Sequence, residues 1–304
     1  MGSRDFESRV KSCYSTWGES YHENYYGSKA AYPPVHVGLI RGLLAARGAR
    51  RIMDAGCGPA SLLRELADPE RELFGFDLTP EMIREGRRVF RELGLPPDNL
   101  REGSILDAES FLPADGKGPG TLDAVLVCGV LPHLPEDREA EALRNVHQAL
   151  RPGGLAVLEA RNQLFALYTL NRYSQDFYRD ELIRAEALRE RLPGPEAAKL
   201  DKALSDLFQR FRTDLPPVRQ GGAGEPGYDQ VLSRTHNPLT FPGRLGEAGF
   251  ADVEVLFYHY HCLPPMLEAA LPETFRAESL AMEDPRDWRG HFMASAFLVT
   301  GRRP

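Results

Sequence analysis

Cysteine is scarce in this chain, and its four copies lie far apart. They stand at Cys13, Cys57, Cys128 and Cys262, without the paired spacing of a zinc site or a disulfide framework. No cluster of metal-ligating residues has a convincing spacing either, so we expect no bound metal. Scattered cysteines are typical of a reducing compartment, and we therefore expect buried thiols in a cytoplasmic protein.

Long apolar runs and an excess of positive charge are also missing. No stretch approaches the ~20 apolar residues of a membrane-spanning helix. The sequence MGSRDFESRVKSC at the start is charged and lacks the apolar core of a secretory signal. The net charge is −7, and a negative surface does not favour binding a polyanion. These absences argue against a membrane protein, and they argue against nucleic acid as the main partner.

What is present is a regular alternation of apolar and amphipathic segments up to residue 162. Continuous apolar strands that alternate with amphipathic helices are typical of a parallel sheet covered on both faces. Thr79 is the expected N-cap of one helix, with Pro80 at its first position. The pattern predicts strands at 50–55, 72–78, 100–107, 122–130 and 154–162, and helices at 35–46, 59–68, 79–94 and 136–154.

The pattern changes after residue 162. Residues 163–215 read as mostly helical, and a Pro/Gly-rich loop follows at 216–227. A further helix is expected at 240–250, with strands at 251–262 and 291–303. The helical block is therefore inserted between the fifth strand and the last two, which predicts one core domain that carries an insertion.

The stretch MDAGCGPAS at 53–61 combines a strand end, a glycine turn and a helix start, an arrangement that binds anions. It lacks the Lys-Ser/Thr pair of a phosphate-binding P-loop, and Ser61 replaces the third glycine of a dinucleotide fingerprint. Asp77 ends the second strand, where a carboxylate can accept hydrogen bonds from both hydroxyls of a ribose. This combination favours a ribose-containing cofactor without a pyrophosphate.

At this point the chain resembles the class I S-adenosylmethionine-dependent methyltransferases. The resemblance covers about residues 50–162, in the order and spacing of that family. It rests on RIMDAGCGPAS, LFGFDLTPEMIREGRR, EGSILD, LDAVLVCGVLPHLP and ALRPGGLAVLEARN.

The resemblance implies an α/β fold, a Rossmann-like parallel sheet of about seven strands with an antiparallel last strand. It also implies an N-terminal lid and an inserted helical cap. We accordingly divide the chain into a lid (1–34), a cofactor-binding core (35–162), a helical cap insertion (163–240) and a segment that completes the core (241–304).

The resemblance also implies the cofactor S-adenosyl-L-methionine and the residues that hold it. Asp77 would bind the ribose hydroxyls, and Leu78 would pack on the adenine. Ser104 stands where this family often has Asp, so Asp107 is an alternative partner for the adenine amine. The matching positions are Tyr14, Tyr21, Asp54, Ala55, Gly56, Gly58, Asp77, Leu78, Ser104, Ile105, Cys128 and Gly129.

Two lid tyrosines, Tyr14 and Tyr21, resemble the aromatic residues that cover the cofactor in this family. An aromatic face stabilises a sulfonium by about 0.5–2 kcal/mol, and a phenol can hydrogen-bond a carboxylate. Trp17 lies between them at a spacing that fits one helix face, which is equally what core packing produces.

Three histidines are candidate catalytic residues. His133 follows the fourth strand, at the sheet edge where open α/β sheets bind ligands, and either acts on the acceptor or holds the loop. His236 precedes a helix at the junction of cap and core. His259 lies in FYHYHC, where strand alternation places Phe257, His259 and His261 on one face and Tyr258 and Tyr260 on the other.

Three further residues are candidates for binding the methyl acceptor. Arg161 and Asn162 end the fifth strand and could orient an anionic or hydroxylated acceptor, although Asn162 could equally cap a helix. His261 is a candidate pocket wall, with ordinary strand packing as the alternative.

The predicted function is transfer of a methyl group to an oxygen or nitrogen of a small metabolite, a natural-product or sugar intermediate. The chain lacks the Asn/Asp-Pro-Pro-aromatic motif of amino-methylating nucleic-acid enzymes after the fourth strand. One alternative is a non-methylating reaction on the same scaffold, and another is a non-catalytic binding partner. The expected partner is a small-molecule acceptor, and the cap is a possible homodimer contact.

Overall fold

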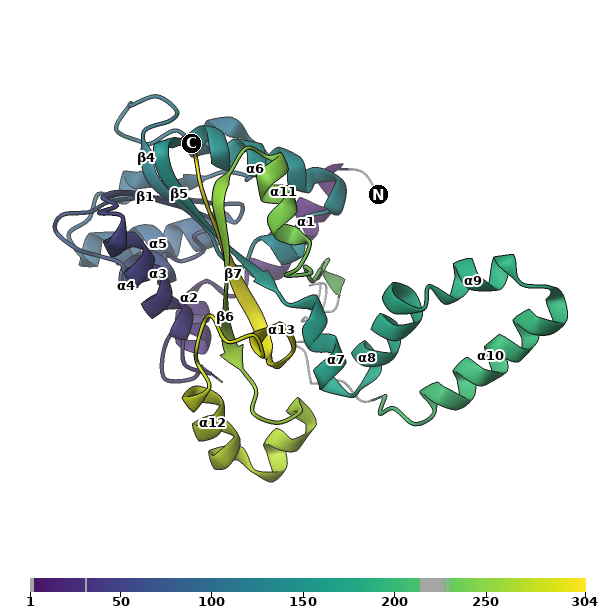
Figure 1. Ribbon diagram of the computed structural model, residues 1–304. Coiled ribbons are helices and arrows are strands. Elements are labelled where there is room, and N and C mark those ends of the chain that lie inside the picture. Colours follow the sequence, from purple (N-terminus) through teal and green to yellow (C-terminus); the bar gives the residue numbers. More distant parts are fainter. Residues whose placement is uncertain (1–2, 31, 214–226, 228–229) are drawn as a thin grey trace.

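A seven-stranded mixed sheet forms the centre of the computed structural model, which describes residues 3–30, 32–213, 227 and 230–304 (Figure 1). The strand order is β3-β2-β1-β4-β5-β7-β6. Strands β1 to β5 are parallel, and β7 lies antiparallel between β5 and β6. The predicted fold class is therefore confirmed. The strands are β1 (Arg51–Ala55), β2 (Glu72–Asp77), β3 (Leu100–Glu102), β4 (Leu122–Val127), β5 (Leu150–Arg161), β6 (Ala251–Tyr260) and β7 (Ala294–Arg302).

Helices cover both faces of the sheet, because neighbouring strand residues are apolar and point to opposite faces. In β4, Ala124 and Leu126 pack in one core cluster, and Val125 and Val127 pack in the other. The helices that contribute to the first cluster include α3 (Val35–Ala46), α4 (Ser61–Glu65) and α5 (Pro80–Glu92). Those that contribute to the second include α6 (Glu136–Ala149) and α11 (Phe241–Glu247).

Short helices join these elements at the sheet edge. Pro80 stands at the first position of α5, as predicted from the sequence. Among the described residues, no helix is both long and apolar enough to span a bilayer. The short elements between the strands are η1 (Pro97–Asn99), η2 (Ala108–Phe111) and η3 (Leu131–His133), and those between β6 and β7 are η7 (Pro265–Ala270), α12 (Pro272–Ala281) and α13 (Gly290–Met293).

The N-terminal helices α1 (Ser3–Tyr14) and α2 (Gly18–Tyr25) precede the core elements. Phe6 of α1 packs in the same cluster as α6, and Trp17 between the two helices is buried. The described part of the predicted lid is therefore anchored to the core by apolar side chains.

The inserted segment after β5 is helical, as predicted, but its outer part does not cover the sheet. Helices α9 and α10 project away from the core (Figure 1), and α10 buries none of its residues. The predicted loop at 216–227 lies outside the described residues except for Gly227. The segment consists of η4 (Gln163–Phe165), α7 (Ala166–Thr169), α8 (Arg172–Asp176), η5 (Phe177–Leu182), α9 (Ala185–Arg191) and α10 (Gly194–Phe208).

Strand β6 departs from simple alternation at His259, whose backbone has a φ of +61°. This left-handed residue turns the next side chain to the other side of the sheet. Phe257 and Tyr260 consequently pack in one core cluster, whereas Tyr258 packs in the other. The predicted pairing of Tyr258 with Tyr260 on one face is therefore wrong.

Candidate functional site

The loop after β1 needs glycine for two physical reasons. Gly56 and Gly58 have φ values of +88° and +51°, which L side chains rarely adopt. A Cβ on Gly56 would also collide with the Val130 side chain. The loop therefore passes close to the end of β4, and the N–H groups of Gly56 and Cys57 hold it by donating to the carbonyl oxygen of Phe76.

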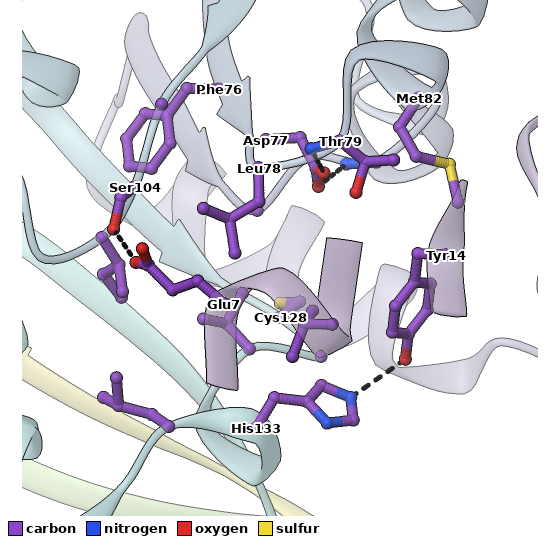
Figure 2. A pocket seen from close by; sticks show the side chains of 18 of the residues that line it. Glu7, Tyr14, Phe76, Asp77, Leu78, Thr79, Met82, Ser104, Cys128 and His133 are labelled. Atoms are coloured by element: carbon purple, nitrogen blue, oxygen red, sulfur yellow. Dashed lines mark hydrogen bonds between the residues drawn. The ribbon is translucent and has the colours of Figure 1, made fainter. Parts of the chain in front are cut away.

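Asp77 at the end of β2 holds this loop in place. Its Oδ2 accepts a hydrogen bond from the Gly58 N–H at 2.9 Å, and its Oδ1 accepts one from the Thr79 N–H at 2.8 Å (Figure 2). Burial raises the pKa of Asp77, and these two hydrogen bonds oppose that rise. Each carboxylate oxygen has a second lone pair, so Asp77 can accept further hydrogen bonds from a ligand.

Asp54 lies at the end of β1 with an unsatisfied oxygen. The side chain is 2% exposed, and its Oδ1 has no hydrogen-bond partner among the described residues. Burial, together with the nearby carboxylates of Asp77 and Glu159, raises the pKa of Asp54 to about 8. A buried carboxylate without a partner is costly, so this atom indicates that a donor or cation completes the site.

A first cavity collects most of the predicted cofactor residues (Figure 2). Every one of them except Asp54 and Ala55 lines its wall, and these two directly precede the loop in β1. The sequence reasoning missed Phe6, Glu7 and Val10, which line the cavity from α1. Their spacing with Tyr14 is that of one helix face, which was the signal available in the sequence.

Aromatic rings form the junction between the lid and the sheet edge. Tyr14 lies 5.1 Å from Trp17 and 6.4 Å from Tyr21 between ring centroids, and Tyr21 lies 4.7 Å from Tyr25. Tyr14 and Tyr21 line the first cavity, whereas the buried Trp17 does not and packs against their rings. The core-packing interpretation therefore holds for Trp17.

The hydrogen bonds of His133 fix its tautomer. Its Nδ1 lies 2.7 Å from the carbonyl oxygen of Leu232, which can only accept, so Nδ1 carries the proton. Nε2 therefore accepts a hydrogen bond from the Tyr14 hydroxyl at 2.9 Å (Figure 2). Burial lowers the pKa of His133 to about 4, so the imidazole is neutral at pH 7.

A second, larger cavity adjoins the first one. Its volume is about 480 Å³, and it lies between α2, the segment that leads to α3, and the ends of β5 and β6. Arg161 and His259, both predicted site residues, line it. The residues that line both cavities are Tyr14, Tyr21, Cys128 and Gly129.

Eight of the residues that line the second cavity are aromatic. The ring of His259 stacks on Tyr32 with centroids 4.1 Å apart. Burial first, and then the neighbouring His261, lowers the pKa of His259 to about 3. Glu159, which the sequence reasoning missed, accepts hydrogen bonds from the Gly129 N–H at 2.8 Å and from the Tyr258 hydroxyl.

The structure does not bring His236 to either cavity. Its Nε2 lies 2.9 Å from Oε2 of the buried Glu139, which Arg234 and Arg244 also contact. Burial alone would raise the pKa of Glu139, but the hydrogen bonds of His236 and Arg244 outweigh it and hold that pKa at about 2. His236 therefore lies in a buried charged cluster outside both cavities, where a structural role accounts for its contacts.

Asn162 is also structural. Its side-chain amide donates to backbone carbonyls around α13, at 2.8 Å for Ala294 and 2.9 Å for His291, and its Oδ1 accepts from the Leu164 N–H. The helix-capping alternative is therefore correct, and the substrate-binding prediction for Asn162 is not supported.

Two further residues lie outside the cavity walls. His261 stacks on His259 with centroids 5.2 Å apart and packs against Phe165, one layer behind the second cavity. Asp107 caps η2 by accepting from the Glu109 N–H at 3.0 Å and does not line the first cavity. Neither residue contacts the space for which it was proposed.

The comparisons with known proteins agree with this geometry. Residues 53–156 match a family profile described as "Methyltransferase domain". A ubiquinone biosynthesis O-methyltransferase of Xanthomonas campestris pv. campestris is 29% identical over 140 residues, which is 46% of this chain and 54% of that protein. An O-methyltransferase of the same name from Xanthomonas euvesicatoria matches to the same extent. The chain thus spans about half the length of the curated relatives it matches.

Among solved structures, the magnesium protoporphyrin IX methyltransferase from Synechocystis PCC 6803 with bound SAH has a TM-score of 0.51. It is 14% identical, and the alignment covers 99% of this chain and 100% of that one. This likeness establishes the fold. The profile match shows that residues 53–156 form a methyltransferase domain, whose cofactor is S-adenosylmethionine.

Proposed function

We propose that the chain transfers the methyl group of S-adenosylmethionine to an oxygen or nitrogen of a small metabolite, a natural-product or sugar intermediate. The cofactor binds in the first cavity and the acceptor in the second. The observation that carries this proposal is that the two cavities meet at Tyr14, Tyr21, Cys128 and Gly129. A donor and an acceptor held on the two sides of this junction would lie next to each other, and positioning of this kind contributes strongly to catalysis.

The polarity of the first cavity supports one orientation of the cofactor. Asp54 does not line the cavity, but it lies in β1 directly before the loop that does, and its unsatisfied oxygen suits an ammonium group at that end. Asp77 suits the ribose hydroxyls, since it already orients the loop and has lone pairs left. The opposite end is apolar and suits the adenine ring, with Phe76, Leu78 and Ile105 among its lining residues.

The bound cofactor supplies an activated methyl group on a sulfonium sulfur. Tyr14 and Tyr21 lie at the junction of the cavities, where their rings can face this cation. The carboxylates of Asp77 and Glu159 add a negative field near the same place, since both help to raise the pKa of Asp54. The site therefore favours the cationic cofactor over the uncharged thioether that remains after transfer.

An acceptor hydroxyl must also lose its proton. His133 lines only the first cavity, whereas Tyr14 lines both. We therefore assign Tyr14 the contact with the acceptor and His133 the final proton acceptor. A cofactor held in the first cavity would supply the methyl group to the acceptor oxygen and would retain the electron pair of the bond it gives up, which leaves the acceptor proton for this chain to take up. The acceptor proton passes to the Tyr14 oxygen while the Tyr14 proton passes to His133 Nε2.

Two observations favour oxygen and a ring-shaped acceptor. The matched Xanthomonas protein is named as an O-methyltransferase. The second cavity is walled by Tyr26, Tyr32, His36 and Tyr258, and aromatic faces suit phenols and sugar rings alike. Arg161 on the same wall suits an anionic substituent of the acceptor.

The experiment is a survey of acceptors with release of S-adenosylhomocysteine as the readout. The panel contains phenols, catechols, aromatic amines, and free and nucleotide-linked sugars. We expect release with members of one hydroxyl-bearing class. Calorimetric binding of the cofactor without release from any class would instead support the non-catalytic alternative. The cytoplasmic location and the homodimer remain predictions. Light scattering of the full chain tests the homodimer.

A further inference from the structure

Ser104 is bonded to a carboxylate that the sequence reasoning did not include. Its hydroxyl donates to Glu7 Oε1 at 2.6 Å and accepts from the Leu106 N–H at 3.0 Å (Figure 2). Glu7 belongs to α1, 97 residues earlier in the chain. Helix α1 thus brings the Glu7 carboxylate next to Ser104. A carboxylate is a stronger hydrogen-bond acceptor than the serine hydroxyl that would otherwise stand there alone.

Glu7 stands at the apolar end of the first cavity. Its neighbours on the wall are Phe6 and Val10 from the same helix and Ile105 from the loop after β3. Among the described residues that line this cavity, the side-chain carboxylates are those of Glu7 and Asp77. Asp77 is committed to the loop after β1, so Glu7 is the carboxylate at the apolar end.

The hydrogen bond with Ser104 orients Glu7 and leaves it capacity to bind a ligand. A carboxylate offers about four lone-pair sites, and Ser104 occupies one of them. A planar, largely apolar ring that carries an N–H donor therefore matches this end of the cavity. An oxygen at the same place on the ring would meet the carboxylate as a second acceptor.

We propose that Glu7, oriented by Ser104, accepts a hydrogen bond from the exocyclic amine of the cofactor's adenine and so selects adenine over hypoxanthine. This inference rests on the proposed placement of the cofactor in the first cavity. It makes α1 part of cofactor recognition, because the selecting group lies on the lid and not on the sheet.

The test is calorimetric binding to the full chain of two ligands, S-adenosylhomocysteine and S-inosylhomocysteine, which carries an oxygen in place of the amine. We expect the unmodified chain to bind the adenine compound at least tenfold more tightly. Glu7→Gln should reduce this ratio to about one, since an amide can donate to the oxygen or accept from the amine. Ser104→Ala should reduce the ratio partially, because Glu7 loses its orienting bond.

Glu102→Gln is the matched control, since Glu102 is an exposed carboxylate at the end of β3 that does not line the cavity. It should leave the ratio unchanged, and thermal melting should show that all variants are folded. Tight adenine binding with a ratio that Glu7→Gln does not alter would overturn this inference and leave the proposed function standing. If the unmodified chain binds neither compound, both the inference and the proposed function fail.

Discussion

The walls of the two cavities that meet under the lid differ in how much of them is backbone and how much is side chain. The first, of about 90 Å³, is walled in part by backbone that hydrogen bonds hold in place, as at Gly58 and Asp77. The second, of about 480 Å³, is walled in large part by side chains, among them the rings of Tyr26, Tyr32 and Tyr258. A wall of fixed backbone recognises one ligand, whereas a wall of side chains can change its shape by substitution. With the proposed assignment of the two cavities, cofactor binding is the rigid function of this site and acceptor choice the adjustable one.

The largest expected effect is on cofactor affinity in the first cavity. Asp77→Ala removes the acceptor of the Gly58 and Thr79 hydrogen bonds and the proposed ribose ligand together. We expect calorimetric affinity for S-adenosylhomocysteine to fall at least a hundredfold, consistent with the loss of about 1.5–3 kcal/mol for each hydrogen bond to a charged group. Unchanged affinity in a folded variant would show that the cofactor lies elsewhere.

The junction should respond in turnover and not in cofactor binding. His133→Ala removes the final proton acceptor, and Tyr14→Phe removes the hydroxyl that joins it to the second cavity. We expect kcat with a hydroxyl acceptor to fall about a hundredfold in each variant, within the usual range of general base catalysis. The double variant should be no slower than either single one, because both act on one proton path; additive losses would contradict the shared path.

The acidity of Asp54 makes cofactor binding depend on pH. Its pKa of about 8 means that the side chain is protonated at pH 6–7 without a ligand. Binding a cation to the carboxylate requires loss of that proton, so affinity for S-adenosylmethionine should rise with pH from 6 to 8, up to about tenfold per unit. Calorimetry in buffers of different ionisation enthalpy should detect the released proton. Asp54→Asn should flatten the dependence; a flat profile in the unmodified chain would exclude this role of Asp54.

Substitutions in the wall of the second cavity should have the smallest effects on activity. His259→Phe keeps a ring stacked on Tyr32 and removes only a neutral imidazole, since the pKa of His259 is about 3. We expect a change of a few-fold in KM for the acceptor and no change in cofactor affinity. A large loss of cofactor affinity would mean that the two cavities are not separate in function.

The first cavity could be predicted because its determinants are local in sequence. Gly56 and Gly58 occupy positive φ positions, and Asp77 ends a buried strand. Each of these requirements limits the residue type at one position, so a short sequence motif is enough to recognise it. The same holds for the sheet, whose apolar strands are visible without knowledge of their partners.

The second cavity could not be predicted in this way, since its residues come together only through tertiary packing. The left-handed backbone at His259 breaks the strand alternation on which the grouping of β6 side chains depended. His236 shows the same limit, because its partner Glu139 lies 97 residues away and nothing local indicates the pair. Glu7 was missed because its role depends on Ser104, equally distant in sequence.

The position of Tyr14 on both cavity walls has a thermodynamic consequence. If the proposed ligands occupy the two cavities, a ligand that orients Tyr14 in one of them lowers the cost of orienting it for the other, so we expect occupancy of one cavity to raise affinity in the other. Linkage requires this coupling to be reciprocal: the factor by which the cofactor strengthens acceptor binding equals the factor by which the acceptor strengthens cofactor binding. Helix α1 would thus link the binding of the two ligands, and the hydroxyl of Tyr14 would be the group that both of them meet.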